Sequence, residues 1–97
     1  MNYYVEVPEE VKKQINSLKD NELAKNIWGK INSLEHNPTK GKHLFKQFYE
    51  LKAKNYRVYY SVHHGIVLIE KFTYLGRIKI LDVGNKNSQR RDSPSLQ

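Results

Sequence analysis

The sequence predicts an α+β domain in which an N-terminal helical hairpin packs on one face of a twisted antiparallel β-sheet. Two observations lead to this class. Apolar residues recur at helical spacing over the first third of the chain, in the pattern of amphipathic helices. From residue 47 to residue 63, apolar and polar side chains alternate with a period of two, which is typical of half-buried strands. Helices followed by strands indicate one layer of each.

A short strand and a first helix are expected at the N-terminus. Residues 3–7 are rich in Tyr and Val and suggest the opening strand. Pro8 occupies the expected first helical position, and Glu9 and Glu10 follow in the first turn, where the helix dipole favours negative charge. The apolar face of this helix consists of Val11, Ile15 and Leu18.

A second helix follows after a short link, so the two should form an antiparallel hairpin. Asp20 or Asn21 can cap its N-terminus, and Asn37-Pro38 is expected to end it. Its apolar stripe consists of Leu23, Ile27, Ile31 and Leu34.

The rest of the chain is expected to form a basic connector and then the sheet. Residues 39–46 are the connector. The strands are predicted at residues 47–54, 56–63, 66–69 and 77–83, with turns at Lys54-Asn55, His64-Gly65 and residues 74–76. We expect residues 1–91 to form one domain and residues 92–97 to be a flexible tail.

The first predicted β-hairpin places its charged side chains on one face. Tyr49, Leu51 and Ala53 share the apolar face of the first arm. The opposite face of the two arms collects Glu50, Lys52, Arg57 and Tyr59. A carboxylate, an ammonium, a guanidinium and a phenol on a rigid sheet are groups that can hold and cleave a phosphodiester.

Composition limits the class of protein and of partner. Residues 1–39 carry a net charge of −1 and residues 40–97 carry +8, an asymmetry that favours a polyanionic partner over a merely solvated surface. There is no cysteine, and the four histidines lack metal-ligand spacing, so no metal or other cofactor is expected. No apolar run could span a membrane and no secretory signal is evident, so a cytoplasmic location is expected.

The hairpin also resembles a known family. The pattern Tyr49-Glu50-Leu51-Lys52, a short turn, and then Tyr56-Arg57-Val58-Tyr59-Tyr60 resembles the RelE/ParE superfamily of toxins from toxin–antitoxin operons. The element order agrees with that superfamily over most of the chain. The segment Lys86-Asn87-Ser88-Gln89 is similar to the tail of the HigB-like branch.

The resemblance implies roles for several residues. Arg57 matches the arginine of the superfamily motif and would hold the phosphate; a salt bridge with Glu50 is the alternative. Lys52 aligns with a lysine that RNA-cleaving members use on the phosphate or as a base, and Glu50 would be the base here. Lys86 would be a terminal cation of the site. Further RNA contacts are expected from Lys46, Lys54, Tyr59, Gln89, Arg90 and Arg91.

The activity that the resemblance implies is metal-independent cleavage of mRNA by attack of its 2′-hydroxyl group, on the ribosome, with a cognate antitoxin protein as the second partner. RNA-cleaving relatives often carry a terminal Tyr or His, whereas this chain has no aromatic residue after Tyr74 and no His after His64. The acid role would then move to Lys86, Tyr59 or His63. The alternatives are a ParE-like inhibitor of DNA gyrase without nuclease activity and a non-catalytic nucleic-acid-binding relative.

Overall fold

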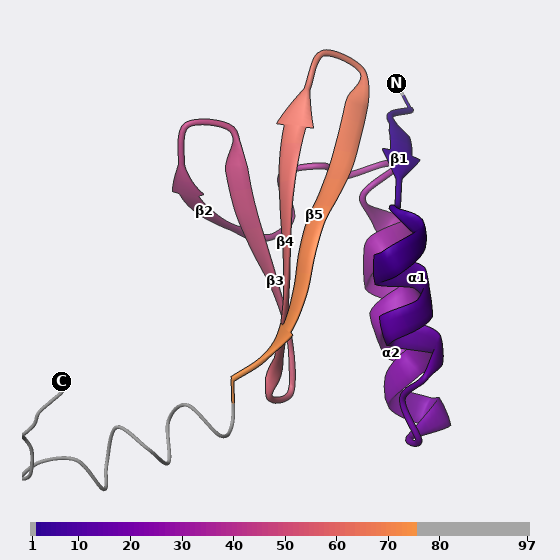
Figure 1. Ribbon diagram of the computed structural model, residues 1–97. Helices are drawn as coiled ribbons and strands as arrows, with labels where there is room; N and C mark the ends of the chain where they lie inside the picture. The colour runs from indigo at the N-terminus through magenta and orange to yellow at the C-terminus, as the bar shows by residue number, and fades with distance from the viewer. Residues whose placement is uncertain (1, 76–97) are drawn as a thin grey trace, which may run out of the picture.

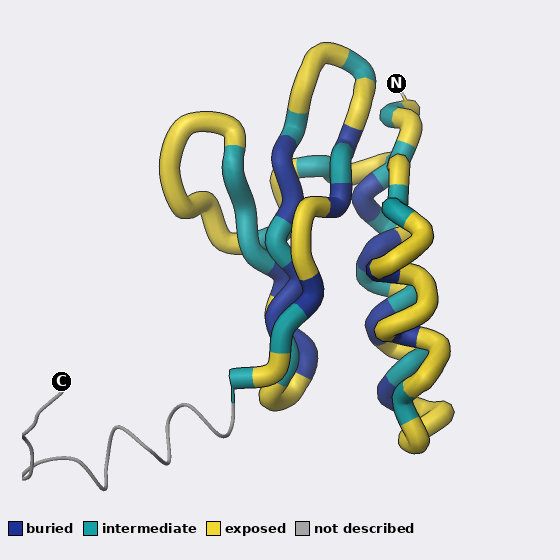
Figure 2. Tube along the Cα trace, viewed as in Figure 1, coloured by how far each residue is buried: buried dark blue, intermediate teal, exposed yellow. Residues whose placement is uncertain are grey.

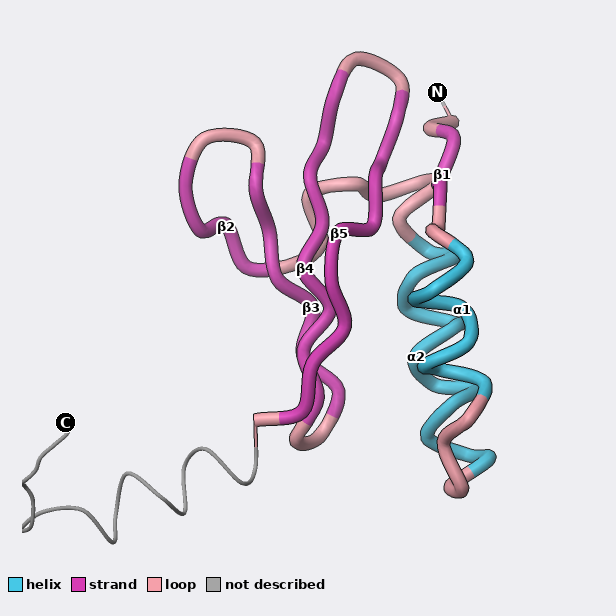
Figure 3. Tube along the Cα trace, in the orientation of Figure 1, coloured by secondary structure: helices cyan, strands magenta, loops and turns pink. Residues whose placement is uncertain are grey.

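The computed structural model describes residues 2–75, which form two helices and five strands in the predicted α+β arrangement (Figure 1 and Figure 3). The elements are β1 (Tyr4–Glu6), α1 (Glu9–Asn16), α2 (Asn21–Ser33), β2 (Lys42–Phe45), β3 (Phe48–Ala53), β4 (Tyr56–His63) and β5 (Ile66–Tyr74). The predicted strand at residues 77–83 and the predicted tail lie outside the described residues.

The five strands form one mixed sheet in the order β1-β5-β4-β3-β2. The three strand pairs from β2 to β5 are antiparallel, as predicted. The predicted antiparallel sheet needs one correction at β1, which runs parallel to β5 with Tyr4 opposite Ile66. A parallel neighbour requires a long connection, and the helices and the other strands provide it. Nothing in the three residues of β1 encodes that direction.

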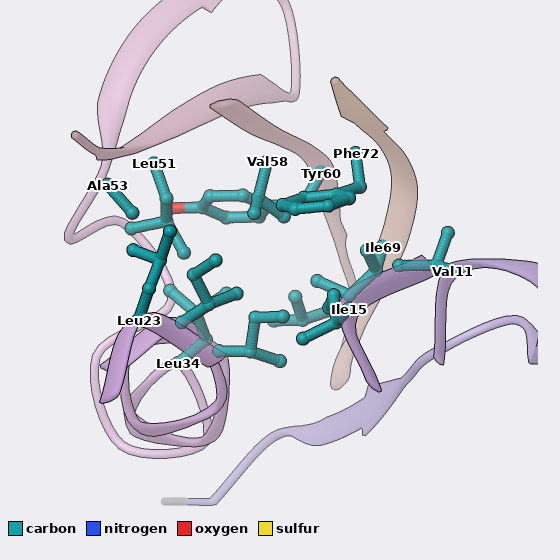
Figure 4. Packing of buried hydrophobic residues seen from close by; sticks show 13 residues of the cluster. Val11, Ile15, Leu23, Leu34, Leu51, Ala53, Val58, Tyr60, Ile69 and Phe72 are labelled. Carbon is teal, nitrogen blue, oxygen red and sulfur yellow. The ribbon is translucent and has the colours of Figure 1, made fainter. Parts of the chain in front are cut away.

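Both helices lie on one face of the sheet, with α1 over β5 and α2 over β3 (Figure 1). The two predicted apolar stripes supply the helical half of the core, and of their residues only Leu18 is partly rather than well buried. The sheet contributes the other half from its helix-facing side. Figure 4 shows Leu51, Val58, Tyr60, Ile69 and Phe72 from the strands facing side chains from the helices. No helix in the described part of the chain is long and apolar enough to cross a membrane.

The helix ends differ slightly from the predicted ones. Helix α1 begins at Glu9, so Pro8 is its N-cap and not its first helical residue. The side chain of Asp20 caps α2 by accepting a hydrogen bond of 3.0 Å from the backbone N–H of Leu23. Helix α2 ends at Ser33, before the predicted stop at Asn37-Pro38. The chain tightens there into i→i+3 hydrogen bonds, which do not continue an α-helix.

The predicted connector at residues 39–46 is wrong in part, because Lys42–Phe45 forms the edge strand β2. All four residues of β2 are exposed (Figure 2), so its sequence lacks the alternation of apolar and polar residues that marks a half-buried strand. Strand β5 is longer than the predicted 66–69 and continues to Tyr74. The edge strand β2 and the extra length of β5 both arise because these residues pair with a neighbouring strand. Such pairing cannot be predicted from local sequence alone.

A fully buried tyrosine fixes the approach to β2. The hydroxyl group of Tyr60 accepts a hydrogen bond of 3.0 Å from the backbone N–H of Gly41. A Cβ atom at position 41 would lie 2.5 Å from the carbonyl oxygen of Glu50 and 2.8 Å from the Tyr60 hydroxyl. The chain can pass β3 this closely only with glycine at position 41.

Burial raises the pKa of Tyr60, against a smaller lowering by the Gly41 hydrogen bond. The folded state therefore holds this proton more tightly than the unfolded state does. The contribution of the protonated Tyr60 to the free energy of unfolding is fully present below the unfolded pKa of about 10 and is lost as the pH rises past it. We expect Tyr60→Phe to lower the free energy of unfolding by about 1 kcal/mol at pH 7. We also expect the stability of the variant to decline less steeply at alkaline pH. Urea unfolding across that range checks this, with exposed Tyr4→Phe as the control; parallel alkaline declines would contradict it.

Candidate functional site

The face of the sheet that the helices leave uncovered carries the predicted quartet of Glu50, Lys52, Arg57 and Tyr59. The β3–β4 register pairs Glu50 with Tyr59 and Lys52 with Arg57, in neighbouring rows. Their alternate neighbours Leu51, Val58 and Tyr60 point into the core on the other side. The four side chains therefore share one face, as the alternation predicts. We call this face of β3, β4 and β5 the open face.

Arg57 is held inside the site and does not extend freely from it. Only 8% of the residue is exposed. Its Nη1 donates hydrogen bonds to the backbone carbonyls of Lys54 (3.0 Å) and Tyr56 (2.9 Å), and its Nε lies 3.9 Å from Oε2 of Glu50. The alternative raised from the sequence, a cross-strand ion pair with Glu50, is thus present. Arg57 therefore bridges two carbonyls at the β3–β4 turn and lies beside the Glu50 carboxylate.

Lys52 is the exposed cation of the quartet, and it lies directly opposite Arg57. Two like charges on directly opposed strand positions destabilise a sheet. An anion bound between these two side chains would offset that repulsion. Lys52 is therefore the residue best placed to contact a phosphate.

Tyr59 can act as a proton donor. Partial burial, followed by the negative charge of Glu50, raises the pKa of Tyr59, while Arg57 opposes the shift. The phenol therefore keeps its proton at neutral pH and cannot serve as a base there. Of the two groups in this row, only the Glu50 carboxylate can accept a proton.

The other predicted contacts are less concentrated than expected. Lys46 lies in the turn between β2 and β3, at the far end of β3 from Lys52. The ammonium group of Lys54 lies 4.0 Å from a carboxylate oxygen of Asp20 at the start of α2, on the side of the sheet that bears the helices. Lys86, Gln89, Arg90 and Arg91 lie outside the described residues, and their roles stay predictions.

A second polar cluster links β4 to β5, and of its members only His63 was named as a candidate from the sequence. The hydroxyl of fully buried Ser61 lies 2.7 Å from Oε2 of Glu70 and 2.8 Å from Nε2 of His63. The hydroxyl donates its one hydrogen to the carboxylate, so Nε2–H of His63 donates to Ser61. A bulge opposite Tyr59 and Tyr60 shifts the strand register next to Glu70, and no sequence signal marks it.

His63 cannot complete the quartet. It lies six residues along β4 from Arg57, roughly 20 Å at the usual strand rise. Of the acid candidates in the described part of the chain, the Tyr59 phenol is therefore the one nearest to Lys52.

Within residues 2–75, no group of three or more His, Asp or Glu residues could hold a metal ion.

Comparison with known proteins identifies the family. Residues 5–73 match the family described as the ParE toxin of the type II toxin–antitoxin system parDE. The chain belongs to this toxin family. The predicted RelE/ParE resemblance is therefore confirmed, while the HigB-like segment lies outside the matched residues. No curated protein sequence matches this ParE-family toxin.

Solved structures support the fold. A free double arginine-to-alanine mutant of Escherichia coli toxin RelE is similar with a TM-score of 0.63 and 16% identity, covering 90% of this chain and 98% of that one. The isolated E. coli RelE toxin is similar with a TM-score of 0.59 and 16% identity, and the match covers 88% of this chain and 97% of that one. The RelBE2 toxin–antitoxin complex from Mycobacterium tuberculosis is similar with a TM-score of 0.60 and 20% identity, and the match covers 76% of this chain and 99% of that one. At these identities, the similarity establishes the fold of this ParE-family toxin.

Proposed function

We propose that this ParE-family toxin is an endoribonuclease that cleaves mRNA on the ribosome. The observation that carries the proposal is the juxtaposition of Glu50, Lys52, Arg57 and Tyr59 in two adjacent rows of the open face. These groups supply a base, a phosphate contact, a positioning residue and an acid. Such sparse machinery suits a substrate that the ribosome holds in place, because orientation can account for much of a barrier.

The reaction needs no metal because RNA contains its own nucleophile. The Glu50 carboxylate takes the proton of the 2′-hydroxyl group, and the 2′-oxygen attacks the adjacent phosphorus. Lys52 stabilises the charge that develops on the phosphate oxygens. The bond from phosphorus to the 5′-oxygen breaks, and Tyr59 donates a proton to that oxygen. The products are a 2′,3′-cyclic phosphate and a free 5′-hydroxyl group.

This proposal predicts that Tyr59→Phe lowers the cleavage rate by about 10²-fold, the lower end of the range for loss of an acid. Because burial and Glu50 raise the pKa of Tyr59, this phenol should keep its proton throughout the neutral pH range. Single-turnover cleavage on programmed ribosomes checks the rate, with Tyr4→Phe as the control. An unchanged rate in Tyr59→Phe would assign the acid role elsewhere.

The proposed protein partner is a cognate antitoxin. The similar RelBE2 structure is a toxin–antitoxin complex, and membership of a type II toxin family carries the same expectation to this chain. An antitoxin that covers the open face would block access to Lys52 and Tyr59. Co-expression with the neighbouring reading frame, followed by co-purification and a cleavage assay, tests this.

Two observations favour inhibition of DNA gyrase as the second candidate. Arg57 uses its guanidinium within the protein, which leaves Lys52 as the exposed cation of the quartet, and the matching family is named for parDE. The two functions separate in one experiment. A nuclease shortens mRNA in a translating extract and leaves gyrase supercoiling intact, whereas a gyrase inhibitor gives the reverse.

A further inference from the structure

Four lysines surround a shallow groove at the edge of β3. The groove has a volume of about 280 Å³ and is lined by Lys30, Lys40, Gly41, Lys42, Glu50, Leu51 and Lys52. Lys42 is paired with Glu50 and lies on the open face with Lys52. Lys30 belongs to α2, on the other side of the sheet. The groove therefore leads from the open face around the edge of β3 to the helical layer.

The groove is positioned by specific contacts. The close approach of Gly41 to β3, with its hydrogen bond to Tyr60, fixes the backbone between Lys40 and Lys42. The hydroxyl group of Ser33 donates to the carbonyl oxygen of Lys30 (2.7 Å), so it accepts the hydrogen bond of 3.0 Å from Nζ of Lys40. Lys40 is thereby held beside the last turn of α2, which also bears Lys30.

Within residues 2–75, no ion pair neutralises the lysines of the groove. Among the described lining residues the one acidic side chain is Glu50, which forms its ion pair with Arg57. Among residues 2–75, the ion pairs are Lys54–Asp20 and Arg57–Glu50, and neither includes a groove lysine. The helix dipole accounts for cations near the end of α2, but it does not account for Lys42 and Lys52. Several phosphates of one strand would satisfy all four ammonium groups.

We infer that this groove binds the phosphate backbone of single-stranded RNA where the strand leaves the open face. This inference rests on the proposed function, and it adds a path for the substrate. Lys52 lies at the junction, because it belongs both to the quartet and to the groove. A short RNA on the open face would reach Lys52, and a longer one would continue past Lys42 to Lys40 and Lys30. These contacts would increase affinity without reading sequence.

The test measures binding apart from chemistry. Full-length protein is titrated with 2′-O-methyl RNA, which lacks the nucleophile and cannot be cleaved, at several salt concentrations. The probes are a trinucleotide and an oligonucleotide of about 10 nucleotides. For K30Q/K40Q, we expect the slope of log affinity against log salt to shrink by about 1.4 with the longer RNA, as for loss of two single-strand phosphate contacts. With the trinucleotide, we expect no change.

The matched control is K12Q/K13Q, which removes the same charge from exposed positions on α1. An equal loss in this control, or an unchanged slope for K30Q/K40Q, would overturn the inference. So would loss of antitoxin binding in K30Q/K40Q with RNA binding intact. If Lys52→Ala weakens RNA binding while K30Q/K40Q does not, the inference about the groove is wrong and the proposed function is retained. If neither variant affects RNA binding, both the inference and the proposed function are wrong.

Discussion

Replacing Lys52 by alanine should lower the rate constant for RNA cleavage by about 10²- to 10³-fold, the usual loss on removal of one transition-state contact. The free energy of unfolding should be nearly unchanged, because the side chain is exposed. Removal of the like charge opposite Arg57 should even relieve a small repulsion. The expected result is a stable, well-folded protein that no longer cleaves.

Single-turnover cleavage on saturating ribosomes, together with urea unfolding, measures the two effects. Lys25→Ala, at an exposed position of α2, is the matched control, since it removes the same charge away from the open face. Lys52→Arg keeps the charge and should retain part of the rate. Full activity in Lys52→Ala would exclude this residue from the transition state and remove the main support for a nuclease.

Replacing Arg57 by alanine should destabilise the fold by about 3 kcal/mol. The variant leaves the carbonyls of Lys54 and Tyr56 without their donor and the half-buried Glu50 without its counter-charge. We expect the lower end of the range for breaking a buried pair, because the 3.9 Å contact is long and 19% of the Glu50 side chain is exposed. Cleavage should also fall, since Glu50 loses its positioning residue.

A double-mutant cycle with Glu50→Gln separates the ion pair from the carbonyl contacts. The effects of Arg57→Ala and Glu50→Gln on the free energy of unfolding should fall short of additivity by about 1 kcal/mol. The rest of the loss in the Arg57→Ala variant would come from the hydrogen bonds to the carbonyls of Lys54 and Tyr56. If Arg57→Ala unfolds at the same urea concentration as the native protein, the guanidinium is not structural and is free to bind phosphate.

Local patterns were sufficient to predict the helices and the β3–β4 hairpin. The stripes of α1 and α2 are buried as their spacing predicts, because helical periodicity places those side chains on one face. The alternation on either side of Lys54-Asn55 determined which side chains share the open face, because a two-residue turn and a period of two leave one register. The grouping of Glu50 with Lys52, Arg57 and Tyr59 could therefore be predicted from the sequence.

Tertiary structure decided the features that depend on partners distant in sequence. The direction of β1 and the existence of β2 come from backbone pairing, which carries no side-chain signature in such short strands. The burial of Arg57 follows from its carbonyl acceptors in a folded turn. Lys30 joins the groove although its half of the sequence carries a net negative charge. A sequence records the charge of each side chain, but only the packing of α2 against the edge of β3 brings these four charges together.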